Sequence, residues 1–449
     1  LVGVALAVLL PALVIVALIV HGERLEAERG KAEHEAALAR EVTDYMVDLF
    51  KGADPNWSPG QVLTAQDLIA QGVDRIGQLD HQPLVQITLL HALSTVLQNI
   101  GEYEDALRLS EQALEKTLML PDATPNQLAE AWLSMAIRLD YLNRYQEASE
   151  AYLQALRHAP AGDSLRIRTL ANLGITLTNL SQHARAEAVF REGIEEARQL
   201  DEGFERMDLL YNSLGRLLWQ MGRIDEALGH FQQALALRLA DPDIGPGHPS
   251  TTSAQGNIAA AYMALGDLDQ AYTGYREALA ARRQALGPSH PDVARLLHMI
   301  GTVSWRRGDT DNAEAYWKEA LEIRLNAYGP EHATVAASRM AMARVAQHQG
   351  ELDLAEALLE QALKAKQSVY GYESRNVADV LFNQGVLYRQ QNRYPESRHA
   401  FEQALLLRQS VLGPDHPRVA ETLKEIGSMT AANESEIKSE DRGLSAIPN

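Results

Sequence analysis

The clearest pattern of small, bulky and polar positions along the chain repeats about every 42 residues. Seven residues before each of eight turn positions lies a small residue, and nine residues after it lies a bulky one such as Phe190 or Trp317, with Ser110 as the exception. Large side chains set against small ones at fixed helical offsets are typical of interlocking helix pairs. We therefore predict about eight helical hairpins, with turns at Gly101, Asn143, Ser181, Gly222, Gly266, Gly308, Gly350 and Asn392.

A loop motif follows the same period. Gly-Pro-x-His recurs with its histidine at His248, His290, His332 and His416, and Ser374 takes the corresponding place between the last two. A metal ion needs three or four ligands that converge on one point. Because the histidines are one repeat or more apart, we interpret them as residues that shape the loop before the next helix, and we assign no metal and no cofactor.

The beginning of the chain differs from the rest. Residues 1–20 are apolar throughout and, at about 1.5 Å per helical residue, could cross a bilayer. A signal-peptide core is shorter, about 7–15 residues, so we favour a transmembrane helix. The expected domains are a transmembrane helix at 1–20, a membrane-proximal helical segment at 21–80, the repeat array with a closing helix at 81–432, and a disordered tail at 433–449.

The composition and the absence of known motifs argue against several classes of function. The formal net charge of -19 argues against nucleic acid as a partner, and the absence of cysteine excludes disulfides. We find no phosphate-binding glycine loop, no nucleophile elbow and no protein-kinase signature, so no catalytic residue is assigned.

The repeat resembles the tetratricopeptide repeat, and its period and Gly-Pro-x-His loops resemble the kinesin-light-chain-like subtype. The resemblance implies an all-α, right-handed superhelical solenoid whose first helices line a concave groove for protein or peptide partners. Asparagines on those helices could bind a peptide backbone through donor and acceptor, or could join adjacent hairpins instead. The candidate partner-binding residues are Asn172, Asn257 and Asn383.

A second resemblance concerns residues 44–76, with Asp44-Tyr45-Met46-Val47-Asp48-Leu49-Phe50 at its start. This stretch looks like the membrane-proximal part of bacterial serine/threonine protein kinases. The resemblance implies a sensor or docking module in the bacterial inner membrane, single-pass with periplasmic repeats, and a kinase domain upstream of Leu1. The alternative is a stand-alone membrane-anchored scaffold. A homodimer through the membrane-proximal helix would suit the kinase.

Overall fold

The computed structural model describes residues 39–47 without 44 and 46, 65–79 without 78, 82–200, 207–241 and 244–428. These residues form α-helices joined by short loops, and they contain no strand. A further helix occupies residues 417–428. The helices are α2 (Ala65–Ile76), α3 (Pro83–Ile100), α4 (Tyr103–Met119), α5 (Pro125–Tyr141), α6 (Tyr145–His158), α7 (Ser164–Asn179), α8 (His183–Arg198), α9 (Met207–Gln220), α10 (Ile224–Ala240), α11 (Pro249–Leu265), α12 (Leu268–Leu286), α13 (Pro291–Arg306), α14 (Thr310–Tyr328), α15 (Ala333–Gln349), α16 (Leu352–Tyr370), α17 (Arg375–Gln390) and α18 (Tyr394–Leu412).

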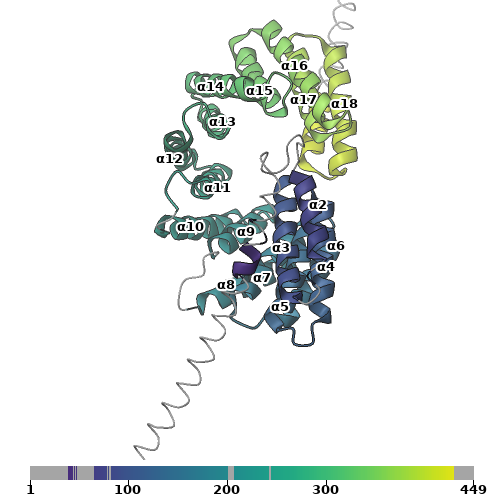
Figure 1. Cartoon of the computed structure of the whole chain (residues 1–449). Helices are drawn as coiled ribbons and strands as arrows, with labels where there is room; N and C mark the ends of the chain where they lie inside the picture. Colours follow the sequence, from purple (N-terminus) through teal and green to yellow (C-terminus); the bar gives the residue numbers. More distant parts are fainter. Residues whose placement is uncertain are drawn as a thin grey trace, which may run out of the picture. The chain divides into compact units, whose positions relative to one another are not determined.

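The chain divides into two compact units, Leu1–Leu217 and Leu218–Asn449, which we call unit 1 and unit 2. In both, helices pack as consecutive hairpins, such as α5 with α6 and α13 with α14, and each hairpin packs on the next. We call the two helices of a hairpin its first and second helix. The first helices of consecutive hairpins also contact each other, as α5 does with α7 and α15 with α17. In unit 2 the odd-numbered helices α11, α13, α15 and α17 lie on the inner side of a curve and the even-numbered ones outside (Figure 1). This is an all-helical solenoid of the tetratricopeptide type.

The predicted turns and interlocking pairs are confirmed. All eight turn residues have a positive φ, including the non-glycine Asn143, Ser181 and Asn392 at 58–59°. At Gly301 an added Cβ would lie 2.6 Å from the indole ring of Trp317, and Gly174 and Gly385 face Phe190 and Phe401 in the same manner. The small residue is therefore required because the ring of the second helix occupies the space of a side chain.

The repeating histidines cap helices, which confirms their interpretation as loop-shaping residues. In all four loops the Nδ1 atom of the histidine accepts a hydrogen bond from the backbone N–H two residues later, at 3.1 Å for His290 and 3.2 Å for His248, His332 and His416. Ser374 replaces the ring with its hydroxyl, which accepts from the N–H of Val377 at 3.3 Å. Each cap satisfies a donor that the first helical turn leaves open.

A buried cation sixteen residues after the turn joins consecutive hairpins in unit 2. Arg324 donates to the carbonyl oxygen of Thr334 at 3.1 Å and to the hydroxyl of Ser338 at 2.7 Å, both on the next first helix. Arg408 makes the equivalent bonds to the carbonyl oxygen of Arg418 and the hydroxyl of Thr422. These donors anchor the ends of α14 and α18 to the helix that follows. Arg282 donates instead to Pro249 and Thr252 on α11, the first helix of its own hairpin, and its Nη1 atom lies 3.8 Å from an Asp292 carboxylate oxygen of the next hairpin. The cations are Arg238, Arg282, Arg324, Lys366 and Arg408, all under 10 % exposed.

The predicted localisation in the bacterial inner membrane is corrected. Within the described part of the chain, no helix combines the length and the apolar character that crossing a membrane requires. The predicted transmembrane helix at 1–20, most of the segment at 21–64 and the tail at 433–449 lie outside the described residues. The array begins at α3 and the closing helix is seen to residue 428, while the predicted domain bounds stay a prediction.

Candidate functional site

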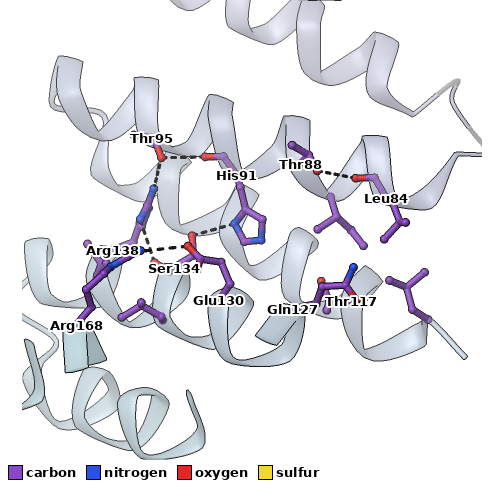
Figure 2. A pocket seen from close by; sticks show the side chains of 14 residues that line it. Leu84, Thr88, His91, Thr95, Thr117, Gln127, Glu130, Ser134, Arg138 and Arg168 are labelled. Atoms are coloured by element: carbon purple, nitrogen blue, oxygen red, sulfur yellow. Dashed lines mark hydrogen bonds and ion pairs between the residues drawn. The ribbon is translucent and has the colours of Figure 1, made fainter. Parts of the chain in front are cut away.

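A pocket of about 370 Å³ lies in unit 1 between α3 and α5, the first helices of two consecutive hairpins. Its lining residues on these helices lie between seventeen and five residues before the turn, mostly three or four residues apart, which places them on one helical face. The C-terminal part of α4 and Arg168 of α7 complete the wall. Figure 2 shows His91 and Thr95 of α3 opposite Ser134 and Arg138 of α5.

One end of the pocket is a polar network. The Nδ1 atom of His91 lies 3.0 Å from the Ser134 hydroxyl. Arg138 donates from Nε to the Ser94 hydroxyl at 2.9 Å, from Nη1 to the Ser134 carbonyl oxygen at 3.3 Å, and from Nη2 to the Thr95 hydroxyl at 2.8 Å. These contacts fix the guanidinium between two consecutive first helices.

Arg138 is a buried cation without an ionic partner. It is only 5 % exposed, and no carboxylate among the described residues forms an ion pair with it. Burial lowers the pKa of its guanidinium. Its position, five residues before the turn, is filled by the buried Thr176 in the next hairpin and by buried apolar residues in the five hairpins after it. Examples are Leu217, Val303, Val345 and Leu387, none more than 3 % exposed.

Burial also acts on the histidine beside it. Desolvation, and then the charge of Arg138, lower the pKa of His91 to about 4. The ring is therefore neutral at pH 7. Its Nε2 atom has no hydrogen-bond partner among the described residues, so one ring nitrogen faces the pocket uncommitted.

The other end of the pocket is apolar, and its rim is charged. Leu84, Ile87, Leu120 and Leu133 form the apolar wall. At the rim, Nη2 of Arg168 lies 3.7 Å from a Glu130 carboxylate oxygen, and both side chains are at least one-third exposed. The pocket thus combines a buried cation, hydroxyl groups and an aliphatic surface.

The inner face of unit 2 carries a different distribution of charge. Helices α11, α13 and α15 contain four arginines and one acidic residue, Asp292 in the first turn of α13. The paired helices α12, α14 and α16 contain seven cations and nine carboxylates. Arg295 and Arg344 are exposed and stand thirteen and six residues before their turns. In a chain of net charge -19, the inner helices of this unit are therefore locally cationic.

The three predicted asparagines lie on first helices, nine residues before the turn, and are half-buried. The Nδ2 atom of Asn383 donates to the Asp379 carbonyl oxygen of its own helix at 2.7 Å. Asn172 belongs to unit 1, whereas Asn257 and Asn383 belong to unit 2. Ser134 holds the same register position in the pocket. Their role in partner binding stays a prediction.

A tetratricopeptide repeat model matches residues 165–240, 250–324, 300–368, 334–405 and 376–436, and two further models of that description match residues 212–285 and 87–118. The chain belongs to the tetratricopeptide repeat family.

Relatives agree with the kinesin-light-chain-like subtype. The chain is 24 % identical over 199 residues to Protein KINESIN LIGHT CHAIN-RELATED 2 of Arabidopsis thaliana, which covers 43 % of this tetratricopeptide protein and 30 % of the relative. It therefore spans less than a third of that relative's length. Among solved structures, the apo form of RapI matches with a TM-score of 0.51 at 13 % identity, over 63 % of this chain and 98 % of that chain. BtubC (BKLC) from P. vanneervenii matches with a TM-score of 0.45 at 21 % identity, over 52 % and 94 %.

These comparisons give no support to the kinase resemblance of residues 44–76, to a membrane segment or to a homodimer. Sequence reasoning also missed His91 and Arg138. The signal for Arg138 was present, because a charged residue stands where the later repeats have uncharged residues, four of them leucine or valine. The signal for His91 was weaker, since only His298 shares its position ten residues before the turn.

Proposed function

We propose that this array is a protein-binding scaffold whose inner face in unit 2 takes an acidic segment of a partner protein. The observation that carries the proposal is the excess of four arginines over one aspartate on α11, α13 and α15. Such a surface attracts negative charge although the chain as a whole is acidic. Met299, Met340 and the half-buried Phe382, at neighbouring positions, add an apolar surface for the partner's side chains.

The test is a binding assay with the full chain and a set of twelve-residue peptides. Each acidic peptide is paired with one in which Gln and Asn replace Glu and Asp. We expect the acidic peptides to bind and their affinity to fall with added salt. Because each exposed charge contact contributes roughly 0.2–1 kcal/mol, the double variant R295Q/R344Q should weaken binding about fivefold to tenfold.

The matched control is K318Q/K364Q, which removes two exposed cations from the second helices α14 and α16. This control should bind like the unchanged chain. Equal losses in the two double variants, or equal binding of acidic and neutral peptides, would contradict the proposal.

We propose further that Asn257 and Asn383 contact the partner's backbone on the same face. Their amides can donate and accept at once, as an extended peptide requires. The double variant N257A/N383A should then weaken peptide capture, while Q361A, which removes an exposed amide from the second helix α16, should leave it unchanged. Unchanged capture by N257A/N383A would remove the asparagines from the site.

A further inference from the structure

We propose that the pocket between α3 and α5 binds a small aliphatic carboxylate. The proposal concerns unit 1 alone and does not depend on peptide binding in unit 2. It rests on the chemistry of the lining residues, which offers a positive charge and free donors at one end and an apolar wall at the other.

The charged end lacks an anion. A guanidinium has five N–H donors, and three of those on Arg138 are used by Ser94, Thr95 and the Ser134 carbonyl. The acceptors are all neutral, so this 5 %-exposed side chain has no direct ion pair among the described residues, and the Glu130 carboxylate acts on its charge only through space. Two N–H groups remain to bind a carboxylate.

His91 supplies a neutral donor next to this cation. When the Ser134 hydroxyl donates to Nδ1, the proton of the neutral ring resides on Nε2. That nitrogen can then donate to the same anion. A carboxylate accepts bonds from both groups at once, whereas an amide or alcohol of the same shape brings no charge to Arg138.

Packing does not account for an arginine at this position. Four of the six later hairpins fill the same register with leucine or valine, the other two with Thr176 and Ala261, and all six residues are buried and uncharged. A buried cation is costly unless it is paired, and leucine would close the contact between hairpins without that cost. The arginine is explained if the position serves a ligand.

Size and net charge restrict the ligand. The volume of about 370 Å³ is at the small end of the range for small-molecule sites. Leu84, Ile87, Leu120 and Leu133 suit a short hydrocarbon chain. Facing the pocket are two cations, Arg138 and Arg168, and one carboxylate, Glu130, which matches a single negative charge.

The test measures binding to the full chain by calorimetry, with hexanoate and the isosteric neutral hexanamide as probes. We expect hexanoate to bind and hexanamide to bind at least tenfold more weakly. A second pair of probes, a tetrapeptide ending in leucine with a free or an amidated C-terminus, distinguishes a free acid from a chain end. Binding of hexanoate alone identifies a free acid, and binding of the free peptide alone identifies a polypeptide C-terminus; either result supports a carboxylate site.

The variant R138L restores the apolar residue of later hairpins, so it should fold and yet lose at least tenfold in carboxylate affinity. R157L removes an exposed arginine from α6 in the same unit and should leave affinity unchanged. The proposal is overturned if neither carboxylate probe binds, if acid and amide bind alike, or if folded R138L binds like the unchanged chain. Circular dichroism of each variant shows that it is folded.

Discussion

In unit 2, five buried cations stand sixteen residues after the turn, and all except Arg282 donate hydrogen bonds to the helix that follows. Arg282 donates instead to the Pro249 carbonyl oxygen and the Thr252 hydroxyl on the first helix of its own hairpin. In unit 1 the same position holds Thr117, Ala159 and Ala197, and the buried cation Arg138 stands on a first helix instead. The hairpin is the same in both units. The difference lies in where the cation points, into a closed contact between hairpins for Arg324 and beside a pocket for Arg138.

The first hairpin of unit 1 also lacks the small and bulky pair that the other hairpins share. Gly301 and Trp317 interlock in unit 2, whereas the corresponding residues of the first hairpin are Ser94 and Ser110. The Ser94 hydroxyl donates to the Ala106 carbonyl oxygen at 2.7 Å and accepts from Arg138. A hydroxyl therefore replaces ring packing and gives the arginine an acceptor. The same fold therefore accommodates a polar site in a hairpin that lacks the aromatic contact between its two helices.

The largest effect is expected from truncating the ring. W317A removes a side chain that is 1 % exposed and donates from Nε1 to the His298 carbonyl oxygen at 3.0 Å. Its cost should be about 3–5 kcal/mol. S110A, at the same position in the first hairpin, should cost about 1 kcal/mol or less, because it loses one hydrogen bond to Leu107. Urea unfolding, monitored by circular dichroism, gives the free energy of unfolding of both variants. Similar losses in W317A and S110A would show that the two hairpins do not differ at this position.

The next effect concerns the cations between hairpins. R324L leaves the Thr334 carbonyl oxygen and the Ser338 hydroxyl without their buried donor, which should cost about 1–3 kcal/mol. Amide hydrogen exchange should quicken first at the start of α15. K318L, on the exposed face of the same second helix, should remain within about 0.5 kcal/mol. Unchanged exchange in α15 would show that the arginine does not join the hairpins.

The smallest effect is a dependence on pH that the units share. Burial, followed by nearby arginines, lowers the pKa of His91 and of His298 to about 4. Unfolded histidine titrates near pH 6.5, so between these values the unfolded state binds more protons. The two rings therefore favour the folded state above pH 6.5, and this contribution is lost as the pH falls towards 4. The variants H91Q and H298Q should each flatten the slope of stability between pH 6.5 and 4 by up to one proton.

The ring of His91 also reports on its neighbour. In R138L the charge that helps to lower its pKa is gone, so the pKa measured by NMR should rise. H298Q leaves Arg138 in place and serves as the control. An unchanged pKa in R138L would mean that burial alone sets it.

The hairpins could be predicted because their signals are local and repeated. A left-handed turn residue such as Gly308, and the pairing of Gly301 with Trp317, leave the same trace in each repeat. The pocket could not be predicted from the sequence, because it forms where two hairpins pack together and depends on one residue, Arg138, that departs from the repeat pattern. The long apolar run at the start suggested a membrane protein, which the described helices do not support.

The most direct measurement compares R138L with R324L in the full chain, by thermal unfolding with and without hexanoate. R138L should show no shift with hexanoate, because the guanidinium that binds the carboxylate is gone. R324L should unfold at a lower temperature and keep the hexanoate shift. If R138L keeps the shift, or if R324L loses it, the two buried cations do not differ in role and the account is wrong.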